Sequence, residues 1–143
     1  MNLIQQLKQE HEEIGQLFGA VNSEISEETP DGASLINELK GLKTTLVTHL
    51  DLEDKLLYPA LSKSGNAEAK KLGLTFSKEM MEISKVAMAF FEKYSQETVE
   101  NLIKSVAFKK ELAAIIQAVV KRVSAEEHML FPAYERYVET RQK

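Results

Sequence analysis

The stretch HLDLEDKLLYP at residues 49–59 returns in altered form near the other end of the chain, as RVSAEEHMLFP at residues 122–132. The fourth residue after each start is a glutamate, Glu53 or Glu126, and each stretch closes with a leucine, an aromatic residue and a proline. Positions four apart lie on the same face of a helix, so the first residue of each stretch and its glutamate point the same way. If both faces turn inward, two carboxylates and the imidazole of His49 meet in a core, which costs free energy unless something satisfies them. A metal ion is the partner that we expect.

The bulk composition describes a soluble protein of ordinary size. The 143 residues suffice for one domain with a sizeable core, and 43% hydrophobic and 28% charged residues are typical of globular proteins. The formal net charge of -4 argues against nucleic acid as the main partner. No apolar run approaches the ~20 residues that span a bilayer, and the opening MNLIQQLKQEHEEI carries too much charge for a signal peptide. We therefore expect a cytoplasmic protein with neither a membrane nor a nucleic-acid partner.

The absence of cysteine restricts the metal chemistry that the chain can support. Without cysteine there are no disulfides, iron–sulfur clusters or thiolate ligands. Any metal must be held by histidine and carboxylate, and the chain has only three histidines, His11, His49 and His128. Of these, His128 follows Glu126 by two residues, so we expect it on the surface of the helix.

Apolar residues recur at spacings of three and four along most of the chain, which predicts an all-α protein. A turn is expected at the sequence Thr-Pro-Asp-Gly of residues 29–32, and Pro59 and Pro132 should kink or loosen the helices that contain them. The resulting fold is a single domain over residues 1–143, an up-down-up-down four-helix bundle with a short crossover helix before the last long helix. The expected long helices are residues 2–28, 33–62, 67–94 and 107–140, and the crossover helix is residues 99–106.

The inward-facing residues of these helices are apolar except near one level. In the first helix, His11 occupies a position where the 3–4 spacing calls for leucine. The inward residues of the second helix are Leu35, Leu39, Leu42, Leu46, His49, Glu53, Leu56 and Ala60, and those of the fourth are Phe108, Leu112, Ile115, Val119, Arg122, Glu126, Met129 and Ala133. Counting from the expected helix ends, at ~1.5 Å per residue, places six side chains in one layer: His11, His49, Glu53, Met80, Arg122 and Glu126.

These motifs resemble those of a known family, the hemerythrin-like (HHE cation-binding) domains, over nearly the whole chain. The resemblance rests on His11, on His49-x-x-x-Glu53 followed by Leu-Tyr-Pro, and on Glu126 followed by Leu-Phe-Pro. It implies a four-helix bundle with a non-haem di-iron centre, in which His11, His49, Glu53 and Glu126 serve one iron. It also implies a role in oxygen or nitric-oxide sensing, oxygen carriage or the repair of damaged iron centres.

The residues that the family uses only for its second iron are missing. The third-helix position that the resemblance expects to be histidine is Met80, for which simple core packing is the expected role. The corresponding fourth-helix position is Arg122, whose guanidinium is always charged and pairs readily with carboxylates.

Two interpretations of the polar layer follow. In the first, one divalent metal ion, iron by resemblance although zinc or manganese accept the same donors, binds the four residues, and Arg122 replaces the second ion. Such a protein would sense or regulate rather than turn over a substrate, and an enzyme of oxidation or repair has the least support. In the alternative, the bundle is metal-free, Arg122 pairs with Glu53 and Glu126 in the core, and the protein acts by binding another protein.

Overall fold

The computed structural model describes residues 2–26 and 32–139. All regular secondary structure in these ranges is helical, which confirms the predicted all-α class. Residues 29–31 of the expected turn and the expected helix ends at residues 27–28 and 140 lie outside the described residues, and the last turn residue, Gly32, instead begins a helix. The helices are α1 (Leu3–Ser26), α2 (Gly32–Leu52), α3 (Tyr58–Ser62), α4 (Ala67–Tyr94), α5 (Val99–Lys104), α6 (Val106–Ala125) and α7 (Phe131–Tyr134), and three five-residue π-helices are η1 (Glu53–Leu57), η2 (Glu126–Leu130) and η3 (Glu135–Glu139).

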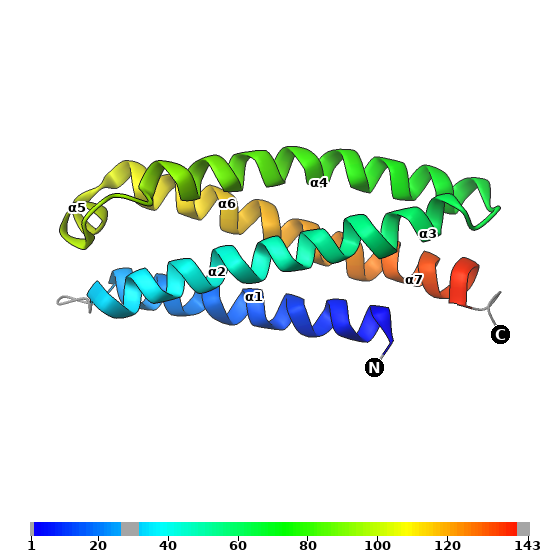
Figure 1. Ribbon diagram of the computed structural model, residues 1–143, viewed down its shortest axis with the longest axis horizontal. Coiled ribbons are helices and arrows are strands. Elements are labelled where there is room, and N and C mark those ends of the chain that lie inside the picture. Colours follow the sequence, from blue (N-terminus) through cyan, green and yellow to red (C-terminus); the bar gives the residue numbers. More distant parts are fainter. Residues whose placement is uncertain (1, 27–31, 140–143) are drawn as a thin grey trace.

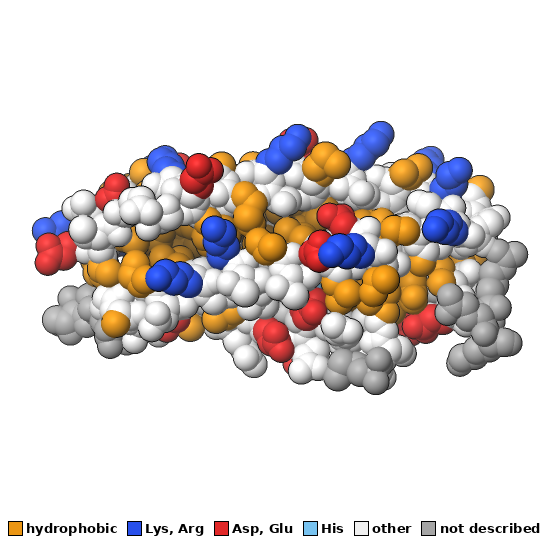
Figure 2. Space-filling view, in the orientation of Figure 1, with side chains coloured by type: hydrophobic (Ala, Val, Ile, Leu, Met, Phe, Trp, Pro, Cys, Tyr) orange, Lys and Arg blue, Asp and Glu red, His pale blue; other side chains and the backbone are white. Residues whose placement is uncertain are grey.

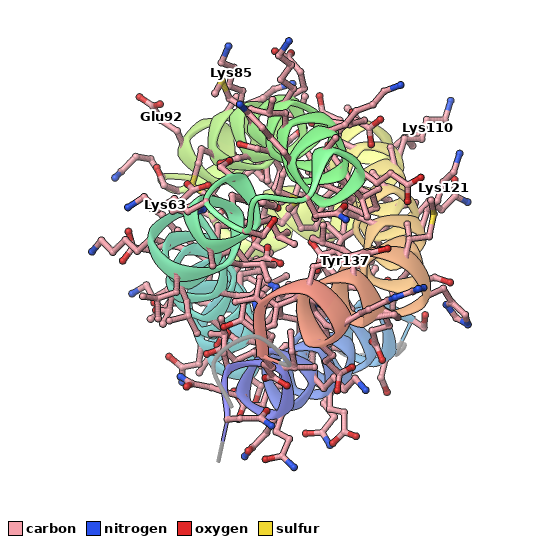
Figure 3. The ribbon with its side chains drawn as sticks, turned by 90° about the vertical axis from the view of Figure 1, so that its right-hand side faces the viewer. Lys63, Lys85, Glu92, Lys110, Lys121 and Tyr137 are labelled. Carbon is pink, nitrogen blue, oxygen red and sulfur yellow. The ribbon has the colours of Figure 1, made fainter. Side chains whose placement is uncertain are left out.

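The long helices lie side by side along the longest axis of the molecule (Figure 1). The continuous rods α2–η1–α3 and α6–η2–α7–η3 run beside α1 and α4, and the short α5 lies at the end opposite to α7. Helix α1 packs against α2 and α6, and α4 packs against α2, α3 and α6. Viewed along this axis, the labelled charged side chains, such as Lys85 and Lys121, point away from the interior (Figure 3). No helix within the described residues is long and apolar enough to cross a membrane.

Side-chain caps fix where the helices begin. The Asn66 side chain accepts a hydrogen bond from the Ala69 N–H at 2.9 Å and starts α4, whose bounds are those predicted. The Thr98 hydroxyl oxygen accepts from the Asn101 N–H at 3.2 Å and starts α5. The crossover helix ends earlier than predicted because Ser105 leaves the helical conformation and caps α6.

The buried core consists of two apolar clusters. One contains Phe18, Leu42 and Phe108 and extends toward α5, and the other contains Leu7, Leu61 and Tyr134 and extends toward α7. Five buried polar or charged residues of the predicted layer belong to neither cluster: His11, His49, Glu53, Arg122 and Glu126. Each of these polar groups therefore needs polar partners, which the two apolar clusters do not supply.

The predicted inward residues are wrong by one position after each glutamate. Leu56 is 51% exposed and Met129 is 54% exposed, whereas their neighbours Leu57 and Leu130 are fully buried. The cause is the π-helical turn in each rod, where the N–H of the aromatic residue donates to the carbonyl of the glutamate five positions earlier. Each turn holds one more residue than an α-turn, so the residues that face the core lie one position later in the sequence after it.

The two prolines follow these widened turns directly. In a regular helix a proline lacks the N–H donor, and its ring clashes with the carbonyl four residues before it. Here Pro59 and Pro132 are the second residues of α3 and α7, immediately after η1 and η2. The expected loosening of the helix thus takes the form of a π-turn in each rod.

Candidate metal centre

Four side chains from three helical rods converge in the polar layer. His11 comes from α1, His49 from α2, Glu53 from η1 and Glu126 from η2. One potential ligand atom of each lies within 4.8 Å of those of the other three, and all four residues are buried, with at most 6% of any of them exposed. The structure therefore brings together the four residues that the sequence analysis named. Their role as metal ligands stays a prediction.

Three of the separations between inner atoms are close to those between ligands of one ion, and a fourth, between His49 Nε2 and Glu126 Oε2, is longer at 3.9 Å. The Nε2 atoms of His11 and His49 are 3.1 Å apart, His11 Nε2 is 2.9 Å from Glu126 Oε2, and His49 Nε2 is 3.4 Å from Glu53 Oε1. Two atoms that each bind an ion at ~2.1 Å are about 3.0 Å apart at a right angle and about 3.4 Å apart at a tetrahedral angle. The three separations fall in or close to this interval.

The outer nitrogens of both histidines are held by carboxylates. His11 Nδ1 donates to Glu127 Oε2 at 3.0 Å, and His49 Nδ1 donates to Glu10 Oε1 at 2.8 Å. Placing the ring proton on Nδ1 leaves the Nε2 lone pair directed inward, which is the tautomer that binds a metal. Two such lone pairs 3.1 Å apart repel each other unless a proton or a cation lies between them.

Glu53 is the least satisfied group in the layer. Its side chain is 0% exposed, and neither carboxylate oxygen has a hydrogen-bond partner. Burial, followed by the negative charge of Glu126, raises the pKa of Glu53 well above its usual range. A buried polar group without a partner costs free energy. A divalent cation bound by Glu53 and its three neighbours would satisfy it.

Glu126 is shifted in the opposite direction. Burial raises the pKa of this carboxyl, but its contacts with His11 and His49 outweigh that effect and lower the pKa to about 2. For His11, burial lowers the pKa, but the carboxylates of Glu126 and Glu127 outweigh it and raise the pKa overall. The layer therefore combines an ionised acid, a neutral acid and a histidine that attracts positive charge. The ionised Glu126 and the raised pKa of His11 both indicate a negative environment that favours a cation.

Arg122 is buried beside this cluster but pairs elsewhere. Its Nη1 donates to the Glu79 carboxylate, its Nη2 donates to the Phe76 carbonyl oxygen at 2.5 Å, and its guanidinium carbon lies 3.9 Å from the centre of the Phe76 ring. The predicted pairing of Arg122 with Glu53 and Glu126 is therefore wrong. On α4 the guanidinium finds an anion, a carbonyl and an aromatic face together, which suits its planar charge. Its positive charge still lowers the pKa of Glu53, less strongly than burial raises it.

Met80 packs into the larger apolar cluster and is 5% exposed. Together with Arg122 and three residues of the converging group, His11, His49 and Glu126, it lines a cavity of about 10 Å³. The predicted packing role of Met80 agrees with this position. His128, which the sequence placed on the surface, is exposed and bonds to the Ser124 carbonyl of its own rod.

Two carboxylates of the centre escaped the sequence analysis. Glu10 precedes His11 but holds His49 on the neighbouring helix, and Glu79 precedes Met80 but holds Arg122. The available signal was their position, since each is an acid next to a residue of the layer. Glu127, which holds His11, has the same relation to Glu126.

Comparison with known proteins connects this centre to one family. Residues 1–61 match the family model of the hemerythrin HHE cation binding domain, and this stretch includes His11, His49 and Glu53. Searches of curated proteins and of solved structures found no match. The resemblance to the hemerythrin-like family that the motifs indicated is thus confirmed over residues 1–61.

Proposed function

We propose that this chain binds one divalent metal ion, with His11, His49, Glu53 and Glu126 as its ligands. The observation that carries the proposal is the convergence of two Nε2 atoms at 3.1 Å beside a fully buried carboxylate without a hydrogen-bond partner. The match of residues 1–61 to a cation binding domain supports it independently. Iron is the metal that the family resemblance favours, and it would supply redox chemistry and affinity for small ligands.

We further propose that the site is mononuclear. The side chains next to the four ligands, Met80 and Arg122, offer a thioether and a fixed positive charge in place of imidazoles. Arg122 is occupied by Glu79 and Phe76, so it leaves the oxygens of Glu53 free for the ion. The proposed fold is a single up-down-up-down four-helix bundle, whose antiparallel packing brings the ligands of three rods to one height.

We also propose a sensing or regulatory role in the cytoplasm, and the way in which the ion would connect the molecule supports the regulatory part. Its ligands belong to α1, to α2 with η1, and to η2, so occupancy would add a direct link between rods that packing and the hydrogen bonds of Glu10 and Glu127 already join. An ion that binds only the folded state stabilises it by about 2.7 kcal/mol at a free concentration of 100 times Kd. A change in occupancy is thereby converted into a change in the rigidity of the bundle.

The alternative proposal is a metal-free bundle that regulates a protein partner. Its main support was an ion pair between Arg122 and the two core glutamates, and Arg122 makes other contacts. The experiment below therefore includes it as the outcome in which no metal binds.

Metal content of untagged protein, purified without chelator and also reloaded with Fe²⁺ under anaerobic conditions, tests the proposal. We expect about one equivalent in the wild type and none in the His49→Ala variant. His128→Ala is the matched control, because it removes the exposed histidine that lies outside the layer. Two equivalents would show that further ligands exist. No metal in the wild type, or equal content in wild type and His49→Ala, would refute the proposed site.

A further inference from the structure

A second, larger cavity lies between the metal centre and the surface. It has a volume of about 280 Å³ and lies between α4 and the α2–η1 rod. Met81, whose side chain is 56% exposed, forms part of its rim, so the cavity opens to solvent. Figure 2 views the face on which α4 and α2 lie together, where apolar side chains show between the charged ones. We call it the outer cavity and the 10 Å³ space at the ligands the inner cavity.

Met80 belongs to the walls of both cavities. The inner cavity touches His11, His49 and Glu126, and the outer cavity touches none of them. Met80 thus lies between the outer cavity and the converging ligand atoms. Methionine is unbranched, has three rotatable side-chain bonds and forms no strong hydrogen bond, so it moves aside more easily than a branched or hydrogen-bonded residue.

Two other approaches to the ligands, along the bundle axis and from α1, meet groups that are harder to move. The apolar clusters pack on both sides of the layer, and the Phe131 ring stacks on His11 with centroids 5.4 Å apart. From the side of α1, the imidazole rings themselves stand in the way, each fixed by a hydrogen bond to Glu10 or Glu127. An ion that approached the Nε2 atoms from α1 would have to break the hydrogen bonds that orient the two imidazole rings.

The outer cavity has donors that suit a cation in transit. The residues that line it include Asp54, Ser77 and Ser84, whose side chains end in oxygen atoms. Hard divalent cations prefer such oxygen donors. Lys85 also contributes to the wall, but its ammonium group pairs with Glu82 at 3.5 Å and its side chain points outward in Figure 3. The charge of Lys85 is thus partly balanced by Glu82.

From these observations we infer that the outer cavity is the path by which a divalent cation reaches and leaves the centre, and that Met80 is its gate. The inference rests on the proposed metal site. A gate has a kinetic signature that other roles lack. Widening it accelerates binding and release by the same factor and leaves Kd unchanged, whereas loss of a ligand raises Kd and loss of packing lowers only stability.

The test is stopped-flow loading of chelator-treated protein with Co²⁺, followed by release of Co²⁺ to excess chelator, with Kd measured separately at equilibrium. We expect Met80→Ala to accelerate both rates by about tenfold, with a change in Kd too small to account for it. Met80→Leu keeps the volume but stiffens the side chain, so it should slow both rates. The Met80→Leu variant also keeps the test possible if Met80→Ala folds poorly. Asp54→Asn should slow loading, because it removes the anion of the outer cavity.

Val119→Ala is the matched control, because Val119 is a buried core residue that lines the inner cavity and not the outer one. It should reduce stability without accelerating exchange. If the wild type binds Co²⁺ but the Met80 variants exchange it at the wild-type rate, or change Kd and the release rate together, the gate is refuted while the metal site stands. If the wild type binds no Co²⁺ at equilibrium, the metal site fails and the gate fails with it.

Discussion

Replacing Glu53 by glutamine should remove a pH dependence from the stability of the metal-free protein and, in the same step, prevent metal binding. The Glu53 carboxyl is 0% exposed and its oxygens have no hydrogen-bond partner. Burial and the charge of Glu126 raise its pKa, so in the absence of metal this carboxyl takes up a proton when the chain folds. Glutamine has nearly the same shape and no charge to desolvate. It is also a poor ligand for a divalent ion in place of a carboxylate.

The size of the effect follows from proton linkage. A carboxyl whose pKa is raised by folding contributes stability that is fully present below its unfolded pKa of about 4.3 and is lost as pH rises toward the folded pKa. Within that interval the loss is about 1.4 kcal/mol per pH unit. For a chain of this size this lowers Tm by about 4 °C per unit.

Two other shifted groups of the layer act outside this window. The pKa of Glu126 is lowered to about 2, so its contribution to the stability of the folded protein grows with rising pH. This growth ends at about pH 4.3, the unfolded pKa of a glutamate. The pKa of His11 is raised, so its contribution to the stability of the folded protein falls with rising pH. This fall begins at about pH 6.5, the unfolded pKa of a histidine. Between about pH 4.5 and 6.5, Glu53 is therefore the one of these three groups whose contribution to stability changes.

The assay is thermal unfolding of chelator-treated wild type and Glu53→Gln across this interval. Tm of the wild type should fall relative to Tm of the variant as pH rises. Glu12→Gln, a substitution at an exposed glutamate of α1, is the control and should keep the wild-type slope. Parallel curves for wild type and Glu53→Gln would refute the assignment of Glu53 as a buried acid that is neutral in the metal-free protein. Undiminished Co²⁺ binding by Glu53→Gln would refute its role as a ligand.

Three further predictions concern the surroundings of the centre. Glu10→Gln should weaken metal affinity by about 10-fold to 100-fold, measured by calorimetry, because Glu10 orients His49 through Nδ1. Tyr58→Phe should stabilise the chelated protein against urea by about 1–3 kcal/mol, because the buried Tyr58 hydroxyl has no partner and Phe131 fills the matching place in the second motif; a loss of stability would show that the hydroxyl is satisfied. Loading with metal to 100 times Kd should stabilise the fold by about 2.7 kcal/mol, and a Tm that ignores the metal would contradict binding to the folded state.

Helical periodicity was sufficient to identify the buried residues of the layer. The polar residues at positions where the apolar spacing calls for leucine, such as His11 and His49, are buried. The same spacing failed beyond the glutamates because each motif offers two adjacent apolar residues. Either Leu56 or Leu57 can continue the pattern, and only the width of the turn decides which one is buried. That width depends on how the whole rod packs, which a local spacing rule does not contain.

The partners of the polar side chains were harder to predict for a related reason. Periodicity states which way a residue faces on its own helix, but Glu10 and Glu79 act on residues of other helices. The chain contains 22 acidic residues, so proximity in sequence to the layer does not single out these two. The error over Arg122 has the same origin, because its neighbours in its own rod suggested Glu126 as a partner while α4 supplied a better one.

The repeated π-turn links the fold to the chemistry of the centre. At 3.6 residues per turn, residues five apart on an α-helix differ by about 140° in direction, so a glutamate and the aromatic residue five places later cannot both face the core. In this structure Glu53 and Tyr58 are both buried, as are Glu126 and Phe131. The extra residue in each turn returns the aromatic residue to the side of the carboxylate, and Phe131 thereby stacks on His11. The widened turn thus lets a single stretch of helix supply both a candidate ligand and the apolar wall that shields the centre from water.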